Sequence, residues 1–284
     1  MKKLKKCFVG VLVCLLMSLW ALCGANAAGT YTMAIMPGHM ACVTTYSAFV
    51  PLINEIEQKA GIELKVVVPE DPDVLMDLVK KGQVDFIYAD APVYLSIEEY
   101  INKDYLLISL TPDMHRTHQA AIIVRKDSKI DSLDDLKGKT FLFGPSFAAS
   151  KGMAAMALLK KSGIDIDKDL DRYFFDGECE NIAMCIDLER TDAGAICIHE
   201  WIDENATEVE CGGKMYKIIG KTEYVAYPPF MVCKNVSPAL AKKVTDVLIN
   251  FQDKEILAGI ESGAFEKADD KDFESMKKVV DYLK

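Results

Sequence analysis

Positive charge is scarce in this chain. Its 33 Lys and Arg residues are outnumbered by 43 Asp and Glu residues, which gives a formal net charge of −10 at pH 7. Four of the lysines lie within the first six residues, so the remainder is more acidic still. A protein with this charge repels the phosphate backbone of nucleic acids, and we exclude nucleic-acid binding. Any anionic ligand must be recognised by local groups acting against the overall field.

Motifs of catalysis and metal binding are also missing. The sequence has no Cys-x-x-Cys, which excludes zinc ribbons and c-type haem attachment. It has no nucleophile elbow and no triad spacing, so we expect neither an enzyme nor a cofactor. His39 with Cys42 is the pair that would suit a soft metal or a thiol-dependent enzyme. A loop histidine beside a buried thiol is the interpretation we prefer, so no metal site is predicted.

A long apolar run occurs only near the N-terminus. The first four lysines precede an apolar stretch over residues 7–23, and Ala25-Asn26-Ala27 follows. This order predicts a signal peptide over residues 1–27, cleaved after Ala27 or Ala28, because the run is too short for a membrane anchor. Lipoprotein anchoring at Cys23 is the second option. We therefore expect a periplasmic protein.

Six of the nine cysteines remain after such a signal peptide. An even number in an oxidising compartment favours disulfides. Cys179–Cys185 and Cys197–Cys211 are candidate pairs, and single buried thiols are the alternative. The sequence leaves the pairing open among these residues: Cys42, Cys179, Cys185, Cys197, Cys211 and Cys233.

Strands and helices alternate along the chain. Strands are predicted over 31–36, 63–68 and 84–88, with helices over 46–59 and 73–82 between them. This β-α-β-α-β order predicts a parallel sheet, and ligands of such sheets lie beyond the carboxyl ends of the strands. The residues that this rule places around one cleft are His39, Tyr46, Tyr88 and Asp90.

The second half of the chain alternates in the same way. Polar connections near 111–118 and 221–226 are typical of crossings between two lobes. We therefore predict an α/β clamshell with a two-segment hinge, in which each lobe is a mostly parallel sheet flanked by helices. Lobe 1 would comprise residues 28–114 and 225–284, and lobe 2 residues 115–224. Arg116 and His118, at the first crossing, would face the cleft or pack in the hinge, and His199 follows a strand end.

The stretch from Lys139 to Ser162 predicts a strand, a turn and a helix. Thr140–Phe143 is β-prone, Gly144-Pro145 ends it, and apolar residues recur at helical spacing from Ser150 onward. Ser146 and Ser150 are placed to cap the helix start. The N–H groups and dipole at a helix start suit an anion, although an ordinary strand-to-helix turn gives the same pattern.

In their order and spacing, several segments of the chain resemble those of the type II periplasmic solute-binding proteins of ABC importers, in the PhnD-like branch for phosphate, phosphite and phosphonate. The segments that carry the resemblance are Gly82–Asp85 with Tyr88–Pro92, Ile122–Ser128, Ser132–Lys139, Phe143–Pro145 with Ser150–Gly152, Gly177–Asn181 and Asp192–Ala195. The resemblance covers nearly all of the chain after residue 27. It implies a monomer that binds a small phosphorus oxyanion, or a related polar solute, and delivers it to membrane permease subunits.

Two positions depart from the family's pattern. Its Ser-Thr-Ser-Gly run falls on Ala149–Gly152, where Ser150 keeps a hydroxyl and Lys151 is a ligand cation or a surface lysine. Glu178 stands where the family tends to have a histidine; its carboxylate either opposes a dianion or only complements the dipole in the first turn of a helix. A neutral, zwitterionic or amine-bearing ligand is therefore an alternative, as is sensing through a partner receptor. The predicted ligand-binding residues are Ser146, Ala149, Ser150, Lys151, Tyr88, Asp90, His39, Tyr46, Glu178 and His199.

Overall fold

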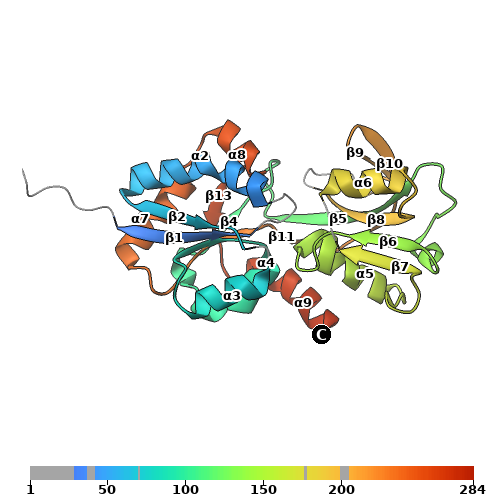
Figure 1. Cartoon of the computed structure of the whole chain (residues 1–284), viewed down its shortest axis with the longest axis horizontal. Helices are drawn as coiled ribbons and strands as arrows, with labels where there is room; N and C mark the ends of the chain where they lie inside the picture. The colour runs from blue at the N-terminus through green and yellow to red at the C-terminus, as the bar shows by residue number, and fades with distance from the viewer. Residues whose placement is uncertain (1–28, 37–41, 70, 176–177, 199–204) are drawn as a thin grey trace, which may run out of the picture.

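The computed structural model describes residues 29–36, 42–69, 71–175, 178–198 and 205–284, which form two mixed β-sheets side by side, each covered by helices (Figure 1). The first sheet has the order β13-β4-β12-β3-β1-β2. Its strands are β1 (Thr30–Ile35), β2 (Glu63–Val67), β3 (Phe86–Tyr88), β4 (Leu107–Ser109), β12 (Pro229–Val232) and β13 (Phe265–Lys267). The chain thus leaves this sheet after β4 and returns to it with β12, which inserts between β3 and β4.

The second sheet lies between these two passages in the sequence and has the order β7-β6-β8-β5-β10-β9. Its strands are β5 (Thr117–Arg125), β6 (Thr140–Phe143), β7 (Arg172–Phe175), β8 (Ala193–Ile198), β9 (Glu208–Cys211) and β10 (Lys214–Lys221). The short β11 (Val225–Ala226) pairs with the start of β5, where the chain passes between the sheets. The predicted two-lobed α/β fold is confirmed.

Each sheet is less parallel than the sequence predicts. In the first sheet β1 runs parallel to β2 and β3, whereas β12 and β13 pair antiparallel with their neighbours. In the second, β6 runs parallel to β7 and β8, but β5 and β10 are antiparallel. Several of the antiparallel strands, β12, β5 and β10, are those by which the chain enters or leaves a lobe, and they do not follow a βαβ crossover.

The helices cover both faces of each sheet, because successive residues of a strand point to opposite sides. On β3, Phe86 and Tyr88 face one core and Ile87 the other. Helices α2 (Cys42–Ala60), α7 (Pro238–Ile249) and α8 (Lys254–Gly259) pack on the first side, and α3 (Pro72–Lys80), α4 (Ala91–Ile97) and α9 (Glu274–Leu283) on the second. In the other lobe, α5 (Ala155–Lys161) and α6 (Cys179–Asp187) take opposite faces.

Short helical turns connect these elements. They are η1 (Glu98–Tyr100), η2 (Lys103–Tyr105), η3 (Leu133–Leu136), η5 (Asp270–Phe273) and the π-helix η4 (Ala149–Ala154), which runs into α5. Ser237 caps α7, with Pro238 at its first position. Helix α3 is capped by the side chain of Asp71, which accepts from the backbone N–H of Asp73. Helices α8 and α9 are separated by β13, because Phe265 is buried in the sheet beside β4.

The two disulfides suggested by the sequence are wrong in this structure, where none of the five cysteines it describes is in a disulfide. Cys179 and Cys185 are six residues apart in α6, a rise of about 9 Å, which exceeds the reach of a disulfide. Cys197 and Cys211 lie on β8 and β9, and strands β5 and β10 separate them. Within the described ranges, no helix is long and apolar enough to cross a bilayer.

Candidate ligand-binding site

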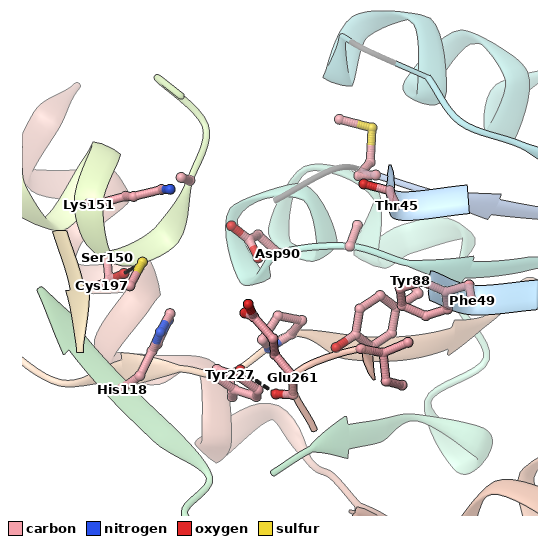
Figure 2. A pocket seen from close by; sticks show the side chains of 15 residues that line it. Thr45, Phe49, Tyr88, Asp90, His118, Ser150, Lys151, Cys197, Tyr227 and Glu261 are labelled. Atoms are coloured by element: carbon pink, nitrogen blue, oxygen red, sulfur yellow. Dashed lines mark hydrogen bonds between the residues drawn. The ribbon is translucent and has the colours of Figure 1, made fainter. Parts of the chain in front are cut away.

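A pocket lies between the two lobes, at the carboxyl ends of β1 and β3. It encloses about 610 Å³ when the part open to solvent is counted. Its lining residues are Met36, Thr45, Phe49, Tyr88, Ala89, Asp90, His118, Ala148, Ser150, Lys151, Cys197, Tyr227, Pro228, Ile260 and Glu261. Both chain segments of lobe 1, before and after lobe 2 in the sequence, and several elements of lobe 2 thus contribute side chains to the pocket (Figure 2).

Lys151 is the cation of the pocket. It belongs to η4, and its side chain is only 1% exposed. Figure 2 shows it reaching from its helix into the space between the lobes. Its Nζ lies 3.9 Å from the sulfur of Cys179. A charge buried this deeply is destabilising unless polar or charged groups compensate it, so buried lysines are typical of functional sites.

Gly144 makes room for this lysine, and Gly152 lets the loop close on itself. A Cβ at Gly144 would lie 2.2 Å from the Cγ of Lys151, and a Cβ at Gly152 would lie 2.2 Å from the carbonyl oxygen of Pro145. The Gly144 N–H also donates to the Lys151 carbonyl over 3.1 Å. The loop therefore closes tightly on itself, and a π-helix, which is common at functional sites, begins at its end.

Ser150 and two thiols lie next to Lys151. Ser150 is buried, and its Oγ is 3.2 Å from the sulfur of Cys197. The backbone N–H of Cys197 in turn donates to the sulfur of Cys179 over 3.2 Å. The hydrogen bond with Cys179 lowers the pKa of Cys197 most, and the charge of Lys151 lowers it further; together they outweigh burial and bring this pKa to about 7.

Asp90 reaches across from lobe 1. It stands at the start of α4 but makes no side-chain cap there. Its carboxylate instead accepts from the backbone N–H of Ala149 over 3.2 Å, at the start of η4. Glu261 is a second lining carboxylate, and its φ of 53° is unusual for a residue other than glycine. Its carbonyl accepts from the Tyr227 hydroxyl over 2.6 Å.

Aromatic rings form the walls between these polar groups. The rings of Phe49 and Tyr88 lie 4.9 Å apart, and those of His118 and Tyr227 lie 5.0 Å apart, edge to face. The Tyr88 hydroxyl is 3.1 Å from the Oγ of Ser109. Burial raises the pKa of Tyr88 strongly, so its hydroxyl stays neutral. These walls exclude water and strengthen the electrostatic interactions of the charged groups.

The structure brings some of the predicted residues together and separates others. Tyr88, Asp90, Ser150 and Lys151 line the pocket, and Ala149 contributes its N–H to Asp90. Ser146 and Tyr46 are exposed, and Glu178 is half-buried at the start of α6; of these three, none is among the lining residues that the structure describes. His39 and His199 lie outside the described residues, as does the side chain of Cys42.

The structure also contradicts one expectation about this region and decides between the two alternatives for Arg116. Neither Ser146 nor Ser150 caps the helix, because η4 begins at Ala149 and Ala148 holds the cap position. Arg116 does not face the pocket as a counter-charge: its guanidinium pairs with Glu266 and Asp272 near the C-terminus. Among the described residues, no group of three or more His, Cys, Asp or Glu side chains is arranged to hold a metal ion.

The sequence analysis missed Cys197, Tyr227 and Glu261 as lining residues. Cys197 is near the carboxyl end of β8, so the same strand-end rule that selected Asp90 would have found it. Tyr227 and Glu261 belong to the returning passage of the chain, and no local pattern indicates that this passage reaches the cleft.

Comparison with known proteins gives a consistent picture. Residues 41–273 match a family model described as the periplasmic substrate-binding protein of phosphonate ABC transporters. A binding protein component of an ABC phosphonate transporter from Pseudomonas aeruginosa has 17% identity and a TM-score of 0.71, with 89% of this chain and 86% of that chain covered. PhnD1 from Prochlorococcus marinus, in complex with methylphosphonate, has 15% identity and a TM-score of 0.72, with 89% and 98% covered.

A third structure, a protein of Xanthomonas citri bound to ATP, has 18% identity and a TM-score of 0.68, with 90% of this chain and 97% of that chain covered. At such identities the three structures share the fold with this chain. The family model matches most of the chain, so it shows the protein family in addition to the fold.

Proposed function

Because this chain belongs to the periplasmic substrate-binding proteins of phosphonate ABC transporters, we propose that its pocket binds a phosphonate that also carries a cationic amino group. The observation that carries the proposal is the charge distribution: a buried lysine beside a buried serine on the lobe 2 side, and carboxylates on the lobe 1 side (Figure 2). A bare dianion would be repelled by Asp90 and Glu261. A zwitterion satisfies both ends.

In this proposal the phosphonyl group binds at the start of η4. Ser150 donates its hydroxyl and Lys151 its ammonium, and the N–H of Ala149 is released when Asp90 turns to the ligand. Charge-assisted hydrogen bonds of this kind are about twice as strong as neutral ones. The ammonium group of the ligand lies between the carboxylates of Asp90 and Glu261, and the aromatic walls enclose its carbon chain.

Ligand binding would close the two lobes, and the closed form would dock on permease subunits in the membrane. We propose lobe boundaries at 114/115 and 224/225, removal of residues 1–27 as a signal peptide, a monomeric protein, and no bond-making chemistry in the pocket. The lining residues Tyr88, Asp90, Ser150 and Lys151 are proposed ligand contacts, whereas Ser146 and Tyr46 are not.

A comparison of two ligands tests the charge argument. We expect 2-aminoethylphosphonate to raise the melting temperature more than methylphosphonate at equal concentration, because the stabilisation of the folded state by a ligand grows as its Kd falls. Titration calorimetry should give an affinity about tenfold or more in favour of the amine, the effect of one opposite charge within 4–6 Å. Equal affinities would exclude a role for the carboxylates.

Asp90→Asn should remove most of this preference. The variant loses one of the two carboxylates proposed to bind the ligand ammonium. Its neutral amide also accepts more weakly from the Ala149 N–H than the Asp90 carboxylate does, so this N–H is more available to the phosphonyl group. We expect weaker binding of 2-aminoethylphosphonate and equal or tighter binding of methylphosphonate, measured by calorimetry. The control is Asp77→Asn, which alters an exposed carboxylate of α3 paired with Lys81. An unchanged preference in Asp90→Asn would place the ammonium elsewhere.

Ser150→Ala should weaken binding of either phosphonate by roughly tenfold or more, since one hydrogen bond to a charged group contributes about 1.5–3 kcal/mol. The melting temperature of the ligand-free protein should stay nearly unchanged. Ser146→Ala, four residues earlier and exposed, is the matched control and should bind as the wild type does. If both variants keep wild-type affinity, the phosphonyl group does not contact Ser150.

A further inference from the structure

Cys179 and Cys197 form a thiol pair next to the proposed anion site. Cys179 begins α6 and Cys197 lies in β8, and these two elements pack against each other. The sulfur of Cys179 is 3.2 Å from the backbone nitrogen of Cys197. The sulfur of Cys197 contacts Ser150, and Figure 2 shows the side chains of Ser150 and Cys197 together at the wall of the pocket.

The two residues are close enough to be bridged. A sulfur at hydrogen-bond distance from the partner's backbone nitrogen is also near the partner's Cβ, and a disulfide needs Cβ atoms about 3.5–4.5 Å apart. The two thiol groups are also hydrogen-bonded to each other, so their sulfurs already lie next to one another. The pair suggested by spacing, Cys179 with Cys185, lacks this proximity because both residues lie along one helix.

The surroundings also make this pair reactive. Lys151 lies 3.9 Å from the sulfur of Cys179, and its charge favours thiolates at this place. The pKa of Cys197 is lowered to about 7 by its hydrogen bond to Cys179 and by Lys151. By contrast, burial raises the pKa of Cys233 to about 12, so that thiol stays protonated. The thiolate is the form that reacts with disulfides.

We propose that Cys179 and Cys197 are a reversible dithiol–disulfide pair, and that the disulfide form binds the phosphonyl anion more tightly than the dithiol form. The second half of this statement rests on the proposed function. The oxidant is an external disulfide, either a small-molecule disulfide or that of an exported thiol oxidase, met in the oxidising periplasm.

The exchange proceeds in two steps. The thiolate of Cys197 attacks one sulfur of the external disulfide, forming a mixed disulfide and expelling one thiolate. The thiolate of Cys179 then attacks the Cys197 sulfur, forming the internal disulfide and expelling the second thiolate. The two protons of the cysteines end on the two expelled thiols. The protein loses two electrons, and the external disulfide gains them.

Oxidation changes the charge that an incoming anion meets. In the dithiol form above pH 7, the thiolate of Cys197 lies against Ser150 and opposes the anion. The disulfide is neutral, so Lys151 acts on the ligand alone. A like charge at this range shifts an equilibrium by about one pKa unit, which corresponds to about tenfold in affinity.

Thiol mapping tests the first half without any ligand. The full chain is expressed with its own leader, recovered from the periplasmic fraction, equilibrated with mixtures of reduced and oxidised glutathione, alkylated and analysed by mass spectrometry. We expect the Cys179 and Cys197 peptides to be linked in oxidising mixtures and alkylated in reducing ones. Cys185→Ser should leave this link intact, whereas Cys179→Ser should abolish it. Alkylation of both residues in the most oxidising mixture would overturn the proposal.

Calorimetry at pH 8 tests the second half, with 2-aminoethylphosphonate and methylphosphonate as probes for the oxidised and reduced protein. About tenfold tighter binding by the oxidised form supports the coupling, and Cys197→Ser should remove the difference. Equal affinities would overturn the coupling while phosphonate binding stands. If the link forms but neither redox state binds either probe, the proposed function and the coupling both fail, and the disulfide alone remains.

Discussion

Replacing Lys151 with methionine is expected to lower the affinity for 2-aminoethylphosphonate roughly 100-fold. The lysine is the cation of the pocket and is 1% exposed, so its ammonium acts on the ligand with little screening. Loss of a charge-assisted hydrogen bond costs about 1.5–3 kcal/mol, and loss of its long-range attraction adds to this. Titration calorimetry on purified protein measures the effect.

The same substitution should not destabilise the fold. Methionine has similar length and no charge, so the substitution removes the desolvation cost of a buried ammonium group. The melting temperature of the ligand-free variant should therefore equal or exceed that of the wild type. Lys137→Met, at an exposed position of lobe 2, is the matched control and should bind normally. A folded Lys151→Met protein with wild-type affinity would contradict the assignment of Lys151.

Gly144→Ala is expected to damage both stability and binding through the same lysine. Its new Cβ would lie 2.2 Å from the Cγ of Lys151 and 2.6 Å from the Cδ, so the lysine must leave its position or the loop must open. Overpacking of this kind costs about 1–3 kcal/mol, and displacement of the ammonium should weaken ligand binding about as much as Lys151→Met does. Urea unfolding and calorimetry measure the two effects.

A double-mutant cycle separates this cause from general loop damage. In a Lys151→Ala background the colliding Cγ is absent, so Gly144→Ala should then cost little stability. Gly259→Ala, in α8 with no atom within 4 Å of its new Cβ, is the control and should change stability by less than about 1 kcal/mol. A Gly144→Ala cost that is the same in both backgrounds would show that Lys151 is not the neighbour that matters.

Local patterns predicted the parts of the site that lie at strand ends. Tyr88 ends a short buried strand and Asp90 follows it, and the rule for parallel sheets places both at the cleft. Gly144 and Pro145 marked the turn before η4, and Ser150 and Lys151 lie within η4, directly after this turn. Such features depend on a few neighbouring residues, which a sequence shows directly.

Other parts depend on contacts between distant segments. Ser146 has the right spacing for a cap, but the Gly144 N–H closes on the Lys151 carbonyl and the helix begins at Ala149. Glu261 reaches the pocket because the chain returns to the first lobe and ends α8 with a left-handed residue. The cysteine count indicated disulfides, but which thiols meet is decided by the packing of α6 on β8.

The most direct test of the central claim is a crystal structure of the complex with 2-aminoethylphosphonate. We predict phosphonyl oxygens within hydrogen-bond distance of the Ser150 hydroxyl and the Lys151 ammonium, and the amino group between the carboxylates of Asp90 and Glu261. A ligand bound in the reverse orientation, or outside this pocket, would contradict the account.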